Sequence, residues 1–287
     1  MLLLSLILAH LIADFYLQTD EMVINKIKNI KKHVGHHFLA NGLVLLGYYL
    51  INYNGTSVFG SLIFPLFFIV ISHFIIDMLK IKLLETIKIN NEENLKRVSF
   101  FLIDQLLHVV SILCAGLFFL GIGFVEIHDF FLGDEKLSTI NKVLFIVIVI
   151  IIATSVSGHL IKILLGSLPN QLLTFEGKYT FKNERQEAQY ANNHTGNRAL
   201  SEEYNYTIFS KHDLSRGKLI GYIERLLVLV LTFYSAYPAI GFIVAAKSIA
   251  RFKQMDDRNW AEYFLLGTLT SMFIGITLGI LLREVLT

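Results

Sequence analysis

The sequence predicts an all-α membrane protein, a polytopic transmembrane helical bundle of about eight membrane segments, from three observations. Of the 287 residues, 54% are hydrophobic and only 17% are charged, and the mean hydropathy is +0.58. Soluble domains carry about 25% charged residues, so the surplus apolar surface needs lipid to cover it. The apolar residues form long runs, and basic residues gather in alternate connections between these runs. The net charge of +2 gives no reason to expect a nucleic-acid partner.

The apolar runs define the membrane segments, because a spanning helix needs about 20 mostly apolar residues. We predict spans at 1–18, 36–52, 61–79, 99–124, 141–165, 219–237, 239–252 and 259–282. The first run lacks a basic segment and a small-residue cleavage site, so we interpret it as a retained helix rather than a signal peptide. The seventh is short and follows Pro238, so it is either a tilted span or a re-entrant half-helix, which would leave seven spans.

The distribution of Lys and Arg predicts the orientation, since these residues favour cytoplasmic connections. Basic residues occur in the connections 19–35, 80–98, 166–218 and 253–258. The alternate connections are nearly bare: 53–60 has no basic residue and 125–140 has only Lys136. The alternation is unbroken, which predicts a multi-pass protein with both termini outside the cytoplasm.

These segments divide the chain into four parts. Residues 1–125 form a four-helix membrane half, 126–165 hold the fifth helix and its outer loop, and 219–287 hold the C-terminal helices. The segment 166–218 is rich in Asn, Glu and Tyr and has little apolar periodicity. It predicts a flexible cytoplasmic loop, and a small regulatory or partner-binding element is the alternative.

Ionisable side chains lie within the first four spans, where each costs about 2.5–3.5 kcal/mol at a helix centre and marks a candidate functional site. They form three pairs, which are His10 with Asp14, His73 with Asp77, and Asp104 with His108. The second span adds His37, with His33 one turn before it and Asn41 one turn after it. A spacing of four residues puts both members of a pair on one helix face. With the predicted orientation, the pairs fall in the cytoplasmic half of the membrane.

Imidazoles and carboxylates together are the ligands that Zn²⁺ and similar transition ions prefer. We therefore predict a site for a divalent metal such as zinc, with candidate ligands His10, Asp14, His37, His73 and His108. The favoured first ligands are His10, His73 and His108. The set exceeds the four ligands of one zinc ion, so either some aspartates orient the histidines from outside or two metals are bound. Asp77 and Asp104 are the candidate general bases. Alternatively, each aspartate only neutralises a histidine and holds the helices together.

A second polar layer lies in the last three spans. Arg225, Lys247 and Arg251 predict a basic clamp for a phosphate-bearing substrate or an anionic lipid headgroup. Two structural explanations compete with this one. Basic residues near helix ends reach towards lipid headgroups, and Glu224 is a possible ion-pair partner for Lys247 or Arg251.

Three stretches of the N-terminal half carry a family resemblance: 9–15 with Gln18, 72–77, and 101–108. They resemble the DUF3307 family of uncharacterised bacterial membrane proteins. The C-terminal stretches 220–225, 245–252 and 261–268 look like the longer members of that family. The resemblance implies a protein of the bacterial inner membrane and implies no reaction.

The residues lead to three hypotheses of function. The first is an intramembrane metal-dependent hydrolase of a lipid-linked substrate, although no His-Glu-x-x-His motif is present. The second is a transporter or channel for metal ions or protons. The third is a non-catalytic membrane sensor or effector. Besides the bilayer itself, the expected partner is an anionic lipid or lipid-linked substrate.

Overall fold

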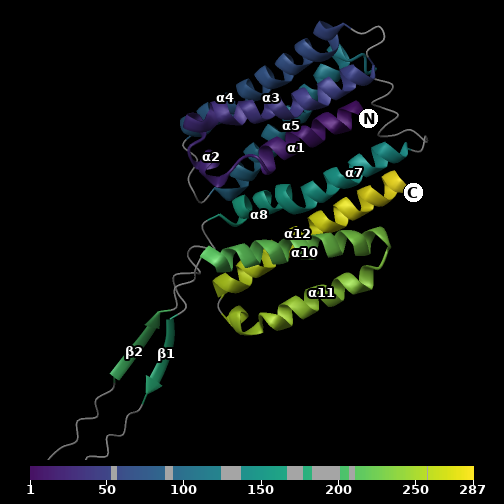
Figure 1. Ribbon diagram of the computed structural model, residues 1–287. Helices are drawn as coiled ribbons and strands as arrows, with labels where there is room; N and C mark the ends of the chain where they lie inside the picture. The colour runs from purple at the N-terminus through teal and green to yellow at the C-terminus, as the bar shows by residue number, and fades with distance from the viewer. Residues whose placement is uncertain are drawn as a thin grey trace, which may run out of the picture.

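The computed structural model describes residues 1–52, 57–87, 93–123, 137–166, 177–182, 201–206, 211–256 and 258–287. The long helices lie side by side in one elongated bundle (Figure 1). The N-terminal helices are α1 (Leu2–Phe15), α2 (Asp20–Ile24), α3 (Lys26–Ile51), η1 (Phe59–Ile63), α4 (Phe64–Ile87) and α5 (Asn94–Phe119). The C-terminal helices are α7 (Thr139–Ile151), η2 (Ile152–Val156), α8 (Ser157–Leu165), α10 (Lys211–Phe233), α11 (Tyr237–Ala250), η3 (Phe252–Asp256) and α12 (Arg258–Leu286).

The helices confirm the predicted fold class, a helical membrane protein. Five stretches of the described chain are long and apolar enough to cross a membrane: 26–51, 59–87, 94–119, 139–165 and 260–286. Helices α1 and α11 are apolar but only 14 residues long. At 1.5 Å per residue each spans about 21 Å, less than the roughly 30 Å of a hydrocarbon core. Every predicted segment falls on a helix, and the number of complete spans stays a prediction.

The helices next to the basic connections 19–35 and 80–98 are longer than predicted. Helix α3 begins at Lys26 rather than at 36, and α4 continues to Ile87, so much of the predicted connections 19–35 and 80–98 is helical. A run of apolar residues marks only the part of a helix that suits lipid, whereas Lys continues a helix at little cost. The predicted spans at 36–52 and 99–124 place His37, Asp104 and His108 in the first turns of their helices, and this placement is wrong. His37 lies about three turns into α3, and Asp104 about three turns into α5.

Helices α1, α3, α4 and α5 form a four-membered ring, in which α1 and α4 each contact both α3 and α5. One end of this ring is apolar. Its buried core comes from the start of α1, the end of α3, the start of α4 and the end of α5, and includes Leu6, Leu45, Ile69 and Ile112. The other end of the same ring is polar and contains the candidate site. The ring is thus divided along its length into an apolar and a polar half.

The C-terminal helices pack against the other side of α1. Leu4 and Leu11 of α1 share a buried cluster with Val149 of α7 and Leu278 of α12. Within this half, α10 and α12 approach closely because α12 has glycines at the contact. A Cβ atom on Gly279 would lie 2.6 Å from Cβ of Thr232. Small residues permit such close contact between membrane helices. Helix α11 lies at the edge of the bundle, on the far side of α10 from the ring (Figure 1).

A β-hairpin is present within the predicted cytoplasmic segment 166–218. Strands β1 (Gly177–Lys182) and β2 (Ser201–Tyr206) pair antiparallel, with Gly177 opposite Tyr206 and Lys182 opposite Ser201. Helix α10 starts at Lys211, before the predicted 219. The rest of this segment lies outside the described residues, as does most of the two bare connections used for the orientation, at 53–56 and 124–136. The flexibility of the segment and the orientation of the chain stay predictions.

Candidate functional site

Five histidines and three aspartates meet in the polar half of the α1–α3–α4–α5 ring. They are His10 and Asp14 on α1, His33 and His37 on α3, His73 and Asp77 on α4, and Asp104 and His108 on α5. Each of the five histidines is at most 2% exposed. The spacing of four residues on each helix turns both members of a pair towards the centre of the ring. We call this set the His/Asp cluster.

The imidazole rings are in contact with one another. His73 stacks on His37 and on His108, with ring centroids 3.6 and 4.1 Å apart. The centroid of His10 lies 5.0 Å from that of His108 and 5.6 Å from that of His73. The rings of the three histidines favoured as metal ligands therefore lie close together, but His108 belongs to a different group of possible ligands from the one that contains His10 and His73.

Asp14 is the carboxylate that most histidines approach. The Nε2 atoms of His37 and His33 lie 2.9 and 3.3 Å from its Oδ1. The Nε2 atom of His10 lies 3.6 Å from Oδ2, and that of His73 lies 3.9 Å from Oδ1. The imidazoles thus present their outer nitrogens to the cluster rather than to lipid.

Asp77 and Asp104 each use one oxygen for a lysine and turn the other towards histidine. Lys26 donates to Oδ1 of Asp77, and Lys80 donates to Oδ2 of Asp104, both at 2.6 Å. Oδ2 of Asp77 lies 3.5 Å from Nε2 of His33, and Oδ1 of Asp104 lies 3.5 Å from Nε2 of His108. Each lysine holds its carboxylate in a fixed orientation, and the second oxygen faces the histidines.

Several of these buried atoms have no hydrogen-bond partner among the described residues. They are Nε2 of His10, Nδ1 of His33 and His73, both ring nitrogens of His108, Oδ2 of Asp77 and Oδ1 of Asp104. Leaving a buried polar group unpaired costs about 1–3 kcal/mol. Native proteins leave few buried polar groups without a partner, so a concentration of them in one place marks a candidate site.

The ligand atoms form three overlapping groups in which all atoms lie within 4.8 Å of one another. The groups are His10, Asp14, His37 and His73; then His33, His73 and Asp77; then Asp77, Asp104 and His108. Bonds of about 2.0–2.2 Å place two ligands of one tetrahedral ion about 3.3 Å apart. The Nε2 atoms of His33 and His73 are 3.1 Å apart, which fits this spacing. His73 and Asp77 are each shared by two groups.

The predicted set of candidate ligands omits His33, which is 2% exposed and contacts Asp14, Asp77 and His73. Its spacing of four residues from His37 was the available signal, but it lay outside the predicted span. Lys26 and Lys80 were likewise assigned to connections. Gln105 donates to Oδ2 of Asp14 at 3.1 Å, and it lies within the stretch 101–108 without any predicted role.

The three predicted clamp residues lie in two different environments. Arg225 is 4% exposed, and its Nε donates to the carbonyl oxygen of Ala153 at 2.5 Å. Its Nη2 and Nη1 donate to the carbonyl oxygen of Thr154 and to Oγ of Ser271. Ala153 and Thr154 belong to the π-helical turn η2, where the regular helical bonding pattern is interrupted. Arg225 therefore satisfies backbone groups that this interruption affects.

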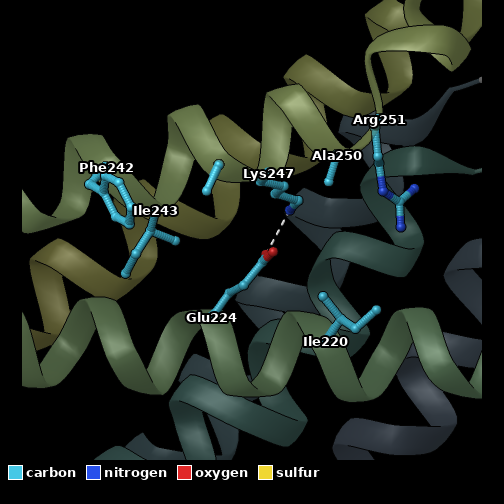
Figure 2. A pocket seen from close by; sticks show the side chains of 8 residues that line it. Ile220, Glu224, Phe242, Ile243, Lys247, Ala250 and Arg251 are labelled. Carbon is cyan, nitrogen blue, oxygen red and sulfur yellow. Dashed lines mark hydrogen bonds and ion pairs between the residues drawn. The ribbon is translucent and has the colours of Figure 1, made fainter.

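Lys247 and Arg251 instead line a groove between α10 and α11, and Lys247 donates to Oε2 of Glu224 at 2.6 Å (Figure 2). The predicted pairing of Glu224 with a C-terminal base is thus present, with Lys247 as the partner. Arg225 is not among the residues that line the groove.

Comparison with known proteins gives one match. The model of the family described as protein of unknown function (DUF3307) matches residues 2–128, which include the four helices of the ring and the whole His/Asp cluster. No curated protein and no solved structure matches the chain.

Proposed function

Residues 2–128 belong to the DUF3307 family of proteins of unknown function, and we propose that they form an intramembrane metal centre that hydrolyses a lipid-linked substrate. The observation that carries this proposal is the gathering of unpaired imidazole nitrogens and carboxylate oxygens at metal-ligand spacing. Hydrogen bonds within the cluster leave these atoms unsatisfied, whereas a divalent cation would satisfy several of them at once.

The charge of the cluster supports a cation rather than an anion as the ligand. With neutral histidines, the three aspartates carry three negative charges, and Lys26 and Lys80 are the lysines that pair with them in the described part of the chain. The remaining negative charge is buried, which is costly unless it is paired or coordinates a metal. Neutral imidazoles are also the form in which histidine binds metal.

The carboxylates supply the acid–base chemistry that hydrolysis needs. A bound divalent ion lowers the pKa of its water to about 7 and polarises the scissile group. We assign the general base to Oδ2 of Asp77 or Oδ1 of Asp104, the oxygens that the lysines leave free. Because Lys26 and Lys80 fix the other oxygen of each carboxylate, the base is held in one orientation.

Transport of metal ions or protons is the second candidate, and the burial of the cluster favours it. With each histidine at most 2% exposed, a substrate as large as a lipid headgroup reaches the cluster only if helices move. An ion or proton needs less space, and the overlapping ligand groups offer successive binding positions.

Metal analysis of the purified full-length chain tests the centre. We expect wild type to bind zinc or another divalent transition ion, and His73→Ala to lose it, because His73 belongs to two ligand groups. His36→Ala is the matched control, since His36 is on α3 beside His37 but belongs to none of these groups. Wild type without affinity for any such ion, or equal metal content in both variants, would contradict the proposal.

Two activity measurements separate the candidate functions. In vesicles of anionic and phosphorylated lipids, a hydrolase releases a water-soluble product. Asp104→Asn abolishes this release while metal stays bound by His10, Asp14, His37 and His73, the ligand group that does not include Asp104. A transporter instead moves the ion into a vesicle that contains a metal-sensitive dye. Ion entry without product release would replace hydrolysis by the second candidate.

A further inference from the structure

A groove runs between α10 and α11, separate from the His/Asp cluster. It encloses about 340 Å³, and its walls include Ile220 and Glu224 from α10 and Phe242, Ile243 and Lys247 from α11, with Arg251 at its end (Figure 2). Helix α11 lies at the edge of the bundle opposite the ring (Figure 1). The groove is therefore a separate place in the fold from the cluster.

The basic groups of the groove differ in how they are paired. Lys247 is bonded to Glu224, which leaves that pair neutral. The backbone N–H of Arg251 donates to the carbonyl oxygen of Ser248, but its guanidinium forms no hydrogen bond or ion pair with any described residue and is available to a ligand. The groove thus has a net positive charge of one at the end of α11. A guanidinium is the side chain best suited to bidentate binding of a phosphate.

The rest of the groove is apolar and faces the surroundings of the bundle. Phe242, which lines the groove, is 75% exposed, as expected of a side chain that contacts lipid in a membrane helix. Phe242 and Ile243 lie at the other end of the groove from Arg251, beyond the Glu224–Lys247 pair, whereas Ile220 lies at the Arg251 end (Figure 2). A ligand that fits this arrangement has an anionic end and an apolar tail.

We propose that the α10–α11 groove binds one anionic phospholipid. The phosphate contacts Arg251, with Lys247 beside it, and an acyl chain lies along Phe242 and Ile243. The groove offers a positive charge at one end and apolar walls at the other end. A free phosphate would match the charge but has no apolar part to contact the walls. A zwitterionic lipid lacks the net charge that matches Arg251.

Basic residues that only reach towards the membrane surface would differ from a defined lipid-binding site in lipid selectivity and stoichiometry. Such residues attract anionic lipids as a group and hold none of them in a defined position. In the groove, the Glu224–Lys247 pair sets the local charge, and the walls set the space for one chain. Selectivity and one-to-one binding are therefore the properties to measure.

The test titrates the purified full-length chain, in neutral detergent, with short-chain phosphatidylglycerol or with phosphatidylcholine of equal chain length. Native mass spectrometry counts the bound lipid. We expect one tight phosphatidylglycerol per chain and an affinity about fivefold lower in Arg251→Gln, the usual contribution of one basic residue to an anionic headgroup. Arg97→Gln, which removes an exposed arginine from α5, is the matched control and leaves the affinity unchanged.

Two further variants test the rest of the site. Glu224→Gln releases the charge of Lys247 and is expected to strengthen phosphatidylglycerol binding. Ala246→Trp fills the groove and abolishes binding, whereas Ala245→Trp, next to it but outside the lining, does not. Equal binding of the two lipids, displacement of lipid by inorganic phosphate, or unchanged binding in both Arg251→Gln and Ala246→Trp would each overturn the proposal.

Discussion

Asp14 has a different place in the cluster from the other two aspartates. Four histidine Nε2 atoms lie within 3.9 Å of its oxygens, and Gln105 donates to it. Asp77 and Asp104 are instead bonded to lysines. Asp14 therefore organises the histidines, because a carboxylate that accepts from several imidazoles fixes their ring orientations.

Asp14→Asn tests this role, since the amide is close in shape but lacks the charge. If Asp14 orients the histidines without binding the ion, zinc affinity falls about 10–100-fold. If Asp14 is itself a ligand, binding is lost. A competition titration with a zinc-binding dye measures the affinity, and Asp256→Asn, an exposed position on η3, is the control. An affinity that does not change would remove Asp14 from the centre.

The sequence predicts the cluster better than it predicts the ligand groups. The three His/Asp pairs were found because charge inside an apolar run is conspicuous and a spacing of four residues fixes the helix face. Lys26 is bonded to Asp77, 51 residues further along the chain. No local pattern encodes such a contact between two helices. His33 was missed for a related reason, since its turn of α3 is too polar to be recognised as part of a span.

At the scale of elements, the π-helical turn η2 and Arg225 depend on each other. The turn interrupts the long helix that continues from α7 into α8, and Arg225 of α10 donates to two of its carbonyl oxygens. Gly158 leaves room for the Tyr222 ring, since a Cβ there would lie 2.9 Å from it, and the Arg225 guanidinium lies 5.4 Å from the centroid of that ring. A single apolar sequence run predicted the helix, but nothing in it predicted the turn.

Arg225→Met tests the contribution of this contact to stability. The substitution keeps much of the apolar side chain and removes the Arg225 donor from the carbonyl oxygen of Ala153, which costs about 1–3 kcal/mol, whereas that of Thr154 still accepts from the backbone N–H of Ser157. We expect a clear fall in the thermal unfolding midpoint of the purified protein in detergent. Arg258→Met, at a side chain 90% exposed, should stay close to wild type. Equal midpoints for both variants would mean that Arg225 does not stabilise the packing of α10 on η2.

At the scale of the whole molecule, the orientation is the prediction on which the sidedness of the cluster depends. We expect cysteines introduced in place of Ser57 and Gly133 to react with a membrane-impermeant thiol reagent added outside the cell. Cysteines at Asn29, Asn90 and Thr195 should react only after the membrane is opened. Replacing the native Cys114 by Ser removes the background signal. Labelling of position 195 from outside would reverse the orientation.

The apolar half of the ring has an electrical consequence. Its buried side chains, including Leu6, Leu45 and Ile112, leave no polar path from the His/Asp cluster to the opposite end of the ring among the described residues. A layer of this kind has a low dielectric constant and insulates, so a membrane voltage falls mainly across it and not across the cluster. An ion that enters from the polar end then has to leave by that same end. Occupancy of the cluster should accordingly be insensitive to membrane voltage, as suits a fixed cofactor better than a transported ion.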